Sequence, residues 1–591
     1  MMKEFFELEK DFDFSLKEGM LIPTLKSQAN RLLSNEEISC FSALKRYSTS
    51  VKEYLKDPPR EVKEVVGIDI ETTGLNVQKD QIRLIAIYSD SYEIVTEYLE
   101  SIRTILEDPK ILKVFHNASF DVSFLEFNNY SVVNYTDTMI MQQILMNNRE
   151  LQSLVKLAKD YLGIQLDKSL QHSENWNGEI TDAHRKYCLQ DAKVTFQLYQ
   201  VMFTKIHNNY LFPTYRREIY ALPAVIEMKL NGIHVDIVGW EKQLELISTE
   251  VADLKSELEE ELHCSNLNSN SQLLRSLKNL GVPLYNVKEK HLASFTGSFP
   301  IVERLLMYKK KQKIISTYGH KLKSFLDHDN RLHGEWSLIG TQTYRMSCSK
   351  PNLQGLPKEL RSYIKAKENH VFIIADYSTI EMRVLAEIAD VSPLIDLLNA
   401  GADLHTSTAQ AVFKDQPIDK VKRQVGKELN FGLIYGLTPY GLANRINSLQ
   451  GMKIDEDEAQ KFMDAYFEKF PEVKSYQHQQ LKSDIITTLG GRYWEERNGL
   501  LELKPRQRFN YAIQSSSAEG LKETLSLVMK NKKREWMLIA AIHDEIVLEV
   551  PIESANEAKC FLEQQMIEGM GKIVKKVPVV VDSKIAKTWV K

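Results

Sequence analysis

Residues 422–436 read KRQVGKELNFGLIYG, and the spacing of their charged and aromatic residues is the most informative pattern in the chain. The side chains that recur at every fourth position are Arg423, Lys427, Phe431 and Tyr435. On an α-helix this spacing forms one slowly drifting stripe that mixes cations with aromatic rings. The cations can neutralise phosphate oxygens while a ring packs on a sugar or base, so the stripe predicts a site for a nucleoside triphosphate.

The alternative for the same stretch is an amphipathic helix whose Arg and Lys side chains extend along its surface. Gly426 and Gly432 lie inside it. Each glycine costs a helix about 1 kcal/mol relative to alanine. A helix of such low stability indicates either that a ligand approaches closely at these glycines or that this element moves.

Carboxylates lie on both sides of this stripe in the sequence. Asp376 ends the strand-like run VFIIAD, and Asp544 stands in IHDEIVLEVP between two apolar runs, which predicts a β-hairpin with Asp544 at its turn. An aspartate in a tight turn is commonly only a turn residue. The pairing of two such acids, with the stripe between them, favours a functional role over a purely structural one.

A second group of carboxylates lies nearer the N-terminus. Residues VVGIDIET predict a β-strand on which Asp69 and Glu71 project from the same face. Asp121 follows in HNASFD, and in YCLQD the residues Tyr187 and Asp191 are four apart, which places them on one face of a predicted helix. Each of these patterns alone is more often structural than functional.

Together and in this order, DIETTG, HNASFD and YCLQD resemble the motifs of the DEDD exonucleases of the tyrosine subtype, the proofreading domain of family A DNA polymerases. The resemblance implies that Asp69, Glu71, Asp121 and Asp191 hold two divalent ions, and that Tyr187 orients the attacking water. Hard oxygen ligands select Mg²⁺, with Mn²⁺ as the alternative ion. Crowded carboxylates repel one another without metal, so the site is expected to need its ions to be stable.

The central stretch resembles the fingers helix of the bacterial DNA polymerase I family, whose pattern Arg-x3-Lys-x3-Phe-x3-Tyr-Gly it meets in full. The resemblance extends from residue 61 to the C-terminus and includes DYSTIEMR, HDE, TYRMSCSKPNLQGLP, DLHTSTA and RQRFNYAIQ. It implies that Asp376, Asp544 and the backbone carbonyl of Tyr377 hold the polymerase metals, with two ions at each active site. Glu381 would lie under the sugar and exclude a 2′-hydroxyl, so deoxynucleotides are preferred.

The resemblance also implies the catalytic residues and the contacts of both substrates. The catalytic residues would be Asp376, Asp544, Tyr187 and Glu71. The residues expected to bind the dNTP are Glu381, His405, Arg423, Lys427, Phe431 and Tyr435. Those expected to line the minor groove of the primer-template or the primer terminus are Arg345, Asn352, Gln354, Arg506, Asn510, Gln514 and His543. The three from 506 to 514 would share one helix face and read acceptors common to all base pairs.

These motifs predict an α/β multidomain fold, in which a ribonuclease H-like exonuclease domain is followed by a right-hand polymerase with palm, fingers and thumb. The expected bounds are 1–60 for an N-terminal extension of unknown role, 61–205 for the exonuclease, 206–335 for a thumb-like helical region, 336–400 and 501–591 for the palm, and 401–500 for the fingers. A chain of 591 residues is too long for one hydrophobic core, which agrees with several domains.

The composition excludes several classes of protein. No apolar stretch approaches the ~20 residues that span a bilayer. The N-terminus lacks the basic and apolar regions of a signal peptide, so we expect no membrane contact and a location in a bacterial or phage-infected host cytoplasm. Five cysteines without a CxxC pair favour reduced, buried thiols over a zinc site or disulfides. The net charge of −4 describes the average field and does not exclude a groove that binds nucleic acid.

Several positions depart from the family pattern. Tyr344 stands where the motif Thr-Gly-Arg usually has glycine, so we expect a bulky ring near the duplex that either stacks there or displaces Arg345. Thr379 stands where glutamine is common, which shortens a contact. The stretch around Arg492 departs from the usual basic pattern, so no role is assigned to that residue.

Two absences favour a compact enzyme. No 5′ nuclease of a few hundred residues precedes the exonuclease motifs, and the helical region has no large segment of the kind that captures a thioredoxin-type processivity factor in some phage relatives. We therefore expect a monomer without such a factor. Asp137 and Lys168 also fall at positions that the family uses, but no catalytic role is expected for them.

The leading hypothesis is template-directed DNA synthesis from a primer with dNTPs, by two-metal nucleotidyl transfer, together with 3′–5′ exonucleolytic proofreading during DNA replication. The alternative is chiefly a 3′–5′ exonuclease whose C-terminal region only binds primer-template DNA. The intact pair Asp376 and Asp544 argues against that alternative. An RNA polymerase of related fold is disfavoured by Glu381 and Phe431.

Overall fold

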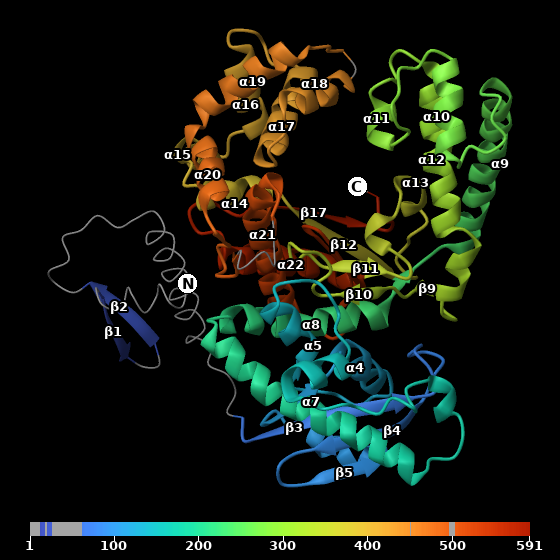
Figure 1. Cartoon of the computed structure of the whole chain (residues 1–591), viewed down its shortest axis with the longest axis vertical. Helices are drawn as coiled ribbons and strands as arrows, with labels where there is room; N and C mark the ends of the chain where they lie inside the picture. The colour runs from blue at the N-terminus through green and yellow to red at the C-terminus, as the bar shows by residue number, and fades with distance from the viewer. Residues whose placement is uncertain (1–11, 18–19, 26–61, 450, 496–502, 591) are drawn as a thin grey trace.

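The computed structural model describes residues 12–17, 20–25, 62–449, 451–495 and 503–590 (Figure 1). An α/β unit lies at the bottom of the view, a second sheet with its helices lies above it, and two helical groups rise from that sheet at the upper left and upper right. The expected extension 1–60 lies outside the described residues except for a hairpin of β1 (Phe12–Lys17) and β2 (Met20–Leu25).

The first α/β unit is built on a five-stranded sheet in the order β5-β4-β3-β6-β7. The strands are β3 (Glu64–Thr72), β4 (Ile82–Tyr88), β5 (Glu93–Thr96), β6 (Ile111–Phe115) and β7 (Tyr135–Asp137). Strand β3 pairs antiparallel with β4 and parallel with β6. The strand predicted from VVGIDIET is confirmed as β3, and the apolar runs of RLIAIYS and KILKVFHNAS form β4 and β6.

Helices cover this sheet and connect its strands. They are η1 (Leu99–Ile102), α3 (Arg103–Glu107), α4 (Ala118–Phe127), α5 (Thr138–Leu145), α6 (Leu154–Leu157), η2 (Ala158–Leu162), η3 (Ser173–Trp176) and α7 (Asp182–Asn208). Helix α7 packs across β3 and β4, and it contains the predicted YCLQD helix. The next helix, α8 (Phe212–Asn231), contacts α4 and α5 below it and α21 (Pro505–Asn531) and β15 (Met537–Ile542) above it, so it joins the two halves of the molecule (Figure 1).

The second sheet has the order β15-β16-β12-β17 and is entirely antiparallel. Its other strands are β12 (His370–Tyr377), β16 (Glu545–Pro551) and β17 (Val581–Ala586). Helices α21 and α22 (Ala555–Gly571) pack on each other beside it, and α22 also contacts β12 and β17. Both predictions for this sheet, a strand over VFIIAD and a hairpin across HDE, are confirmed.

A helical insertion separates β12 from β15 in the sequence. It consists of α14 (Ile380–Ile388), α15 (Ser392–Asn399), α16 (Leu404–Phe413), α17 (Lys420–Ile434), α18 (Pro439–Asn447), α19 (Glu456–Lys469), α20 (Pro471–Lys482) and the hairpin of β13 (Ile485–Thr487) and β14 (Tyr493–Glu495). Most of these helices form the upper-left group in Figure 1. The predicted fingers region 401–500 therefore includes helices α16 to α20 together with the β13–β14 hairpin.

The upper-right group is an arm in which α9 (Ile237–Glu261) packs along α12 (Pro300–Tyr318) (Figure 1). Its shorter helices are α10 (Asn270–Asn279), α11 (Glu289–Ala293) and η4 (His320–Phe325). Short strands and helices connect the arm to the second sheet: β8 (Ile233–His234), β9 (Arg331–Leu332), β10 (Glu335–Ser337), β11 (Ser347–Ser349), η5 (Leu353–Gly355) and α13 (Lys358–Arg361); η6 (Ile552–Ser554) follows β16. The long helix α9 lies within the region 206–335 that was expected to be helical.

The cysteine prediction is confirmed in part. Cys188, Cys264 and Cys348 are free and buried, but Cys560 is exposed on α22, so the expectation of buried thiols is wrong there. Cys560 lies on the solvent-facing side of α22, because only the opposite side of this helix is buried. Cys40 lies outside the described residues. Within the described ranges, no helix is both long and apolar enough to cross a bilayer.

Two candidate active sites

The first candidate site forms where α7 crosses β3. Gly67, Asp69 and Glu71 alternate along β3 and therefore project from the side of the sheet that α7 covers. A Cβ atom at Gly67 would lie 2.2 Å from the carbonyl oxygen of Ala192, so glycine is what lets the helix come this close. The close approach brings Asp191 of α7 to the two strand carboxylates.

Carboxylates of four residues meet at this crossing. One oxygen from each of Asp69, Glu71 and Asp191 lies within 4.8 Å of the others. Asp121 of α4 accepts a hydrogen bond from the backbone nitrogen of Ile70 at 3.3 Å and is only 4% exposed. The structure thus brings together the exonuclease carboxylates that the sequence predicts, and this set of hard oxygen donors fits Mg²⁺ or Mn²⁺.

Asp137 holds the loop that carries Asp121. Its carboxylate accepts hydrogen bonds from the backbone nitrogens of Asn117 at 3.1 Å, Ala118 at 2.9 Å and Met139 at 2.7 Å. It therefore caps α5 and also clamps the start of α4, where otherwise unpaired N–H groups would be exposed. Asp137 therefore contacts the site through the backbone at the start of α4.

Burial and mutual repulsion raise the pKa values of these carboxyl groups. Burial is the largest cause for Asp69, and Glu71 and Asp191 raise the pKa of Asp69 further. Burial, with Asp191 next, raises the pKa of Glu71 to about 8. Burial also raises the pKa of Asp121 and of Asp191, and Lys168 opposes the rise at Asp191. A cation among these groups would stabilise their charged forms and lower their pKa values again. This behaviour is expected of carboxyl groups that bind a metal ion.

Tyr187 and Lys168 stand beside Asp191. The Lys168 ammonium lies 2.5 Å from Asp191 Oδ2, 3.1 Å from Tyr187 Oη and 4.9 Å from the centre of the Tyr187 ring. Burial raises the pKa of Tyr187 to about 12, so its phenol stays protonated at neutral pH and can donate a hydrogen bond. This geometry suits the predicted role of Tyr187 in orienting water, and it makes Lys168 a counter-charge to Asp191.

Addition of Mg²⁺ should stabilise the unit that holds this site. An ion at about 100 times its dissociation constant adds about 2.7 kcal/mol, which raises the melting temperature of a unit of this size by about 5–10 °C. Differential scanning calorimetry with Mg²⁺ and with EDTA measures the shift. Asp69→Ala should melt higher than the parent without metal and lose the shift, whereas Asp376→Asn should keep it. A full Mg²⁺ response in Asp69→Ala would contradict the assignment.

The second candidate site lies at one edge of the β15-β16-β12-β17 sheet. Strand β12 ends with Asp376 and Tyr377, and the turn His543–Asp544 joins β15 to β16 beside it. Asp376 pairs in register with Glu545, and the Tyr377 N–H donates to the Asp544 carbonyl at 3.2 Å. Asp376 and Asp544 therefore lie on adjoining segments at the same edge, as the hairpin prediction requires.

The side chain of Tyr377 anchors this edge. Its hydroxyl lies 2.6 Å from Thr524 Oγ1 of α21 and donates to the carbonyl of Met566 of α22 at 2.8 Å. Burial raises the pKa of this phenol. The backbone that carries the predicted metal-binding carbonyl is thereby tied to both helices behind the sheet.

Glu381 lies in the first turn of α14, directly after β12, and is held from two sides. Nη2 of Arg345 and Oη of Tyr435 each donate a short hydrogen bond to its carboxylate. Burial raises the pKa of Glu381, and Arg345 opposes that rise. These contacts join the end of the aromatic stripe to the residue expected to lie under the sugar.

The predicted stripe lies on α17. Arg423, Lys427 and Phe431 are inside the helix, while Tyr435 is its C-cap residue. Arg423 donates to Asp403 at 2.6 Å and 3.2 Å, and this pairing holds the pKa of Asp403 well below its ordinary range. Lys427 is exposed. A triphosphate that reaches Arg423 must therefore compete with Asp403.

Two expectations about this helix need correction. A Cβ atom at Gly426 would lie 2.2 Å from the carbonyl oxygen of His405, and one at Gly432 would lie 2.6 Å from Leu437, so both glycines permit packing within the protein rather than the approach of a ligand. His405 itself is 6% exposed, with its ring 5.7 Å from that of Phe431. It supports the stripe from inside and is not open to a triphosphate in this structure.

The predicted DNA contacts differ in how exposed they are. Arg506, on the first turn of α21, and His543 are exposed, and Asn510 and Gln514 follow on the same helix, half-buried. Asn352 uses its side-chain oxygen to accept from two backbone nitrogens of η5 at 3.1 Å. Gln354 donates to two backbone carbonyls, each at 3.3 Å. The last two side chains are therefore already engaged by the protein.

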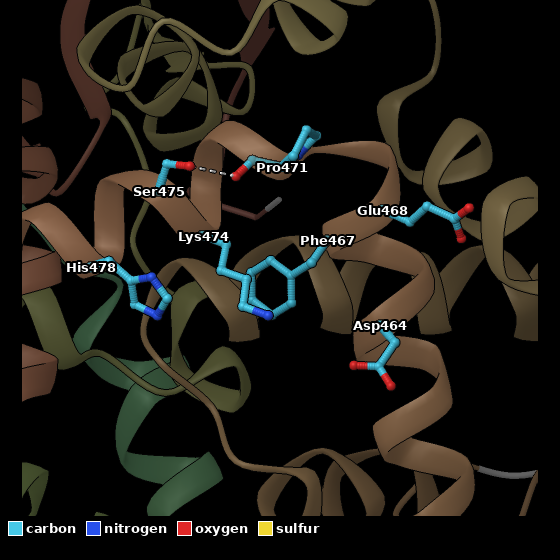
Figure 2. A pocket seen from close by; sticks show the side chains of 7 residues that line it. All are labelled: Asp464, Phe467, Glu468, Pro471, Lys474, Ser475 and His478. Atoms are coloured by element: carbon cyan, nitrogen blue, oxygen red, sulfur yellow. Dashed lines mark hydrogen bonds between the residues drawn. The ribbon is translucent and has the colours of Figure 1, made fainter.

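A pocket of about 430 Å³ lies at the junction of α19 and α20 (Figure 2). Its lining comprises Asp464, Phe467, Glu468, Pro471, Lys474, Ser475 and His478. The Ser475 hydroxyl donates to the Pro471 carbonyl at 3.2 Å, which is a local helix contact. The lining includes none of the predicted site residues, so this pocket belongs to neither candidate site.

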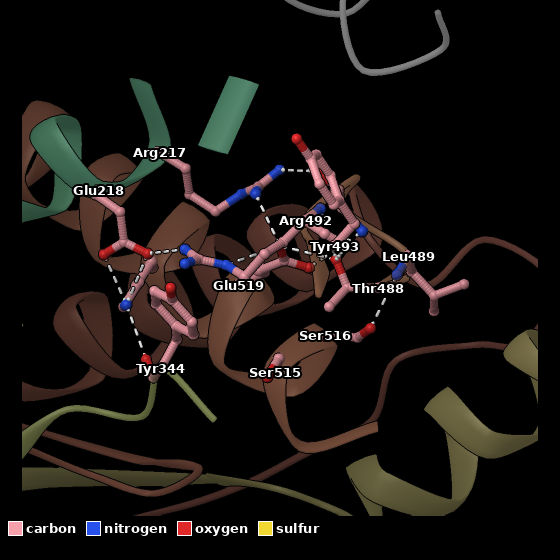
Figure 3. A network of polar contacts seen from close by, with 12 residues as sticks. Arg217, Glu218, Tyr344, Thr488, Leu489, Arg492, Tyr493, Ser515, Ser516 and Glu519 are labelled. Carbon is pink, nitrogen blue, oxygen red and sulfur yellow. Dashed lines mark hydrogen bonds and ion pairs between the residues drawn. The ribbon is translucent and has the colours of Figure 1, made fainter. Parts of the chain in front are cut away.

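The expectation for Tyr344 is wrong. Its side chain is 0% exposed and lies inside the protein, between Arg492 (Figure 3) and Asn147, in the junction between the two halves of the molecule. The ring lies under the Arg492 guanidinium at 3.2 Å, and Arg345 stays on Glu381 rather than being displaced. Tyr344 has a φ of 60°, which costs a residue with a side chain about 1 kcal/mol that glycine would not incur.

Arg492 belongs to a buried network of charges that surrounds Tyr344 (Figure 3). The cations are Arg217, Arg492 and Lys522, and the anions are Glu218, Glu519 and Glu523. Arg492 donates to Glu218 at 2.6 Å, and Lys522 donates to both oxygens of Glu218 and to the Tyr344 carbonyl at 2.8 Å. Three cations balance three anions, so the network joins α8, α21 and the β13–β14 turn without net charge.

Sequence reasoning missed two residues beside the sites. Asp403 pairs with Arg423, and Lys229 of α8 lies 6.0 Å from the ring of Phe120 next to Asp121. Asp403 could have been found, since it opens the quoted motif DLHTSTA. Lys229 is distant in sequence from the exonuclease motifs, and only the packing of α8 on α4 brings it there.

Comparison with known proteins places these sites in a family. The family model described as DNA polymerase family A matches residues 239–591. The chain belongs to DNA polymerase family A. A second model, described as 3′-5′ exonuclease, matches residues 45–207 of this polymerase. The predicted order, an exonuclease domain followed by a polymerase domain, is confirmed, and enzymes of both families generally depend on divalent metal ions.

Relatives of this polymerase include bacterial DNA polymerases I. It is 30% identical to DNA polymerase I of Aquifex aeolicus over 571 residues, covering 89% of this chain and 95% of the relative. It is 28% identical to DNA polymerase I of Borreliella burgdorferi, covering 85% of this chain but only 60% of the relative. A solved structure of the POL domain of Pol1 from M. smegmatis, in complex with DNA primer-template and dNTP, matches with a TM-score of 0.76 at 23% identity, over 89% of this chain and 95% of that one, which confirms the fold.

Proposed function

We propose that this family A polymerase extends a DNA primer at the site of Asp376 and Asp544, and removes nucleotides from the primer 3′ end at the site of Asp69, Glu71, Asp121 and Asp191. The observation that carries the proposal is that each set of acids, dispersed in the sequence, lies together in a separate part of the fold. The proposed substrates are primer-template DNA and dNTPs, as in the M. smegmatis complex.

At the polymerase site, Asp376, Asp544 and the Tyr377 carbonyl would hold two Mg²⁺ or Mn²⁺ ions. Bound ions would lower the pKa of the primer 3′-hydroxyl and neutralise the charge that develops on the phosphates. Arg423 and Lys427 would face the triphosphate, with Arg423 exchanging Asp403 for phosphate oxygens. These residues would position the triphosphate and neutralise its negative charge, because phosphoryl transfer requires little covalent chemistry from the protein.

At the exonuclease site, the same ions would be held by the four carboxylates. Tyr187 keeps its proton and is placed to orient a water, while Lys168 offsets the charge of Asp191. Phe120 and Lys229 lie beside Asp121 and would border the entering 3′ nucleotide. The proposed domain bounds remain 61–205 for this activity, 206–335 for the thumb, 336–400 and 501–591 for the palm, and 401–500 for the fingers.

A direct experiment tests the two activities together. The full chain is incubated with a labelled primer-template and Mg²⁺, and the products are separated by length. Template-directed extension with dNTPs, and shortening of the primer without them, are expected from a monomeric enzyme. An enzyme that shortens the primer but adds no nucleotide under any dNTP concentration would be chiefly an exonuclease, and would contradict the proposal.

Selection of deoxynucleotides is proposed to depend on Glu381. Because Arg345 and Tyr435 both bind its carboxylate, the side chain cannot swing away from a 2′-hydroxyl at low cost. Glu381→Ala should lower the ratio of kcat/KM for dCTP over rCTP by about 100-fold, equivalent to about 3 kcal/mol of lost discrimination. Single-nucleotide insertion kinetics measure this ratio. Glu381→Gln keeps the bulk and should retain most of it; an unchanged ratio in Glu381→Ala would reject the role.

A further inference from the structure

Tyr344 is anchored at three points in the junction between the exonuclease and polymerase domains. Its ring lies 3.2 Å from the Arg492 guanidinium and packs edge-on against Trp494, with 5.9 Å between ring centres. Its hydroxyl lies 2.6 Å from Asn147 Oδ1. Two guanidinium nitrogens of Arg492 are buried without a hydrogen-bond acceptor among the described residues, so the ring face adds a cation–π contact to the charge compensation by Glu218 and Glu519.

Asn147 belongs to the exonuclease domain, two residues after α5 ends. Its oxygen accepts from Tyr344, and its amide nitrogen donates to the carbonyl of Tyr493 on β14. Gln143, one turn earlier, donates to the Ile339 carbonyl at 3.4 Å. The end of α5 is thus held by the polymerase domain, while Asp137 at the other end of α5 clamps the loop of the exonuclease site.

On the polymerase side, Tyr344 is followed directly by Arg345. Backbone hydrogen bonds close this loop, from Gly340 N to the Arg345 carbonyl at 2.9 Å and from Tyr344 N to the Thr341 carbonyl at 3.0 Å. Arg345 then reaches Glu381. The backbone at Tyr344 has a φ of 60°, which disfavours any residue with a side chain, so these backbone hydrogen bonds and the buried ring together hold the loop in this shape.

We propose that Tyr344 is a positioning residue that connects the loop 340–345 to Asn147 of the exonuclease domain. The position of the exonuclease domain thereby determines how well the polymerase site discriminates against a mispaired primer end. The inference rests on the proposed function at one point, the contact of Arg345 with the primer-template. It concerns a side chain at a position where the family motif usually has glycine. The coupling passes through contacts that are continuous from Asn147 to Glu381.

The test measures mismatch discrimination by the polymerase site alone. The full chain carrying Asp69→Ala serves as the parent, because it should not remove mispaired ends. The measured quantity is kcat/KM for the next nucleotide on a matched primer end divided by the value on a mismatched end. Tyr344→Phe removes only the hydroxyl and should lower this ratio about fivefold, while extension of the matched end changes less than about twofold.

Asn147 provides the decisive variant, because it lies in the exonuclease domain. Asn147→Gly removes the acceptor and suits the φ of 53° at that position. It should lower discrimination as Tyr344→Phe does, and the double variant should lose little more than Asn147→Gly alone, because both substitutions break the hydrogen bond between Tyr344 and Asn147. Asn147→Gly also removes the contact with the Tyr493 carbonyl, and Tyr344→Phe also removes a 3.2 Å hydrogen bond to the Gln143 carbonyl. Tyr344→Gly removes the ring but can still adopt the positive φ at this position, and it should lower discrimination further.

A matched control separates positioning from general stability. Gln78 of the exonuclease domain lies 2.6 Å from His333 across another part of the same junction. Gln78→Ala should lower the melting temperature much as Asn147→Gly does, yet leave discrimination unchanged. The inference is overturned if Asn147→Gly keeps the parent's discrimination, if the effects of Asn147→Gly and Tyr344→Phe multiply, or if Gln78→Ala matches them. Absence of any extension by the Asp69→Ala parent would overturn the proposed function and this inference with it.

Discussion

Replacement of Asp376 by asparagine should abolish primer extension, with kcat/KM lowered by at least about 10³-fold, and leave exonuclease activity within about twofold of the parent. Loss of a residue that merely orients a metal ligand already costs about 10–100-fold, so loss of the ligand itself costs more. Asparagine keeps the size and one oxygen of the side chain but removes the charge that the ions need. Quenched-flow measurement of single-nucleotide addition to a matched primer resolves the rate.

The control for this substitution is Asp390→Asn. Asp390 pairs with Lys576 at 2.6 Å on the surface near the same sheet, and its φ of 51° is one that asparagine adopts readily. Exposed ion pairs contribute little to stability, so this variant should extend the primer like the parent. Extension by Asp376→Asn at more than about a tenth of the parent rate would show that the ions are held elsewhere.

Replacement of Asp69 by alanine should abolish removal of the primer 3′ end, again by at least about 10³-fold in rate, while extension persists. Asp69 is one of three carboxylates whose oxygens lie within 4.8 Å of one another, so its loss removes one of the proposed metal ligands. The rate is followed on single-stranded labelled DNA with Mg²⁺ and without dNTPs. Burial of the remaining carboxyls gives them raised pKa values, which further weakens their hold on an ion at neutral pH.

Asp160→Ala is the matched control in the exonuclease domain. Asp160 forms an exposed i,i+4 pair with Lys156 at 2.7 Å, away from the carboxylate cluster. This variant should degrade single-stranded DNA at the parent rate. If Asp69→Ala retained exonuclease activity comparable to that of Asp160→Ala, the cluster on β3 and α7 would not be the hydrolytic site.

Local patterns in the sequence predicted the elements that carry the acids. Alternation placed Asp69 and Glu71 on one face of a strand, and the apolar runs around HDE predicted the hairpin that holds Asp544. These predictions succeeded because they need only the period of one strand or one helix. The motif resemblance then predicted which distant acids come together, and the crossing of α7 over Gly67 is the physical reason that Asp191 reaches Asp69.

Packing between elements was beyond such patterns. The glycines of α17 were interpreted as room for a ligand, but they permit contact with His405 and Leu437. A sequence alone shows that a glycine weakens a helix and does not show what lies against it. The same limit applies to Tyr344, whose ring was expected near the duplex. Its partners, Asn147 and Arg492, lie about 150–200 residues away in the chain, and no local periodicity links such positions.

The central claim is that one chain carries two independent active sites, and a crossed assay tests it most directly. A labelled primer with a mispaired 3′ end, annealed to its template with Mg²⁺, is incubated with and without dNTPs, using the parent, Asp69→Ala and Asp376→Asn. The parent should remove the mispair and then extend, Asp376→Asn should only shorten the primer, and Asp69→Ala should neither shorten it nor readily extend it, yet extend a matched primer normally. Loss of both activities in either single variant would contradict two independent sites.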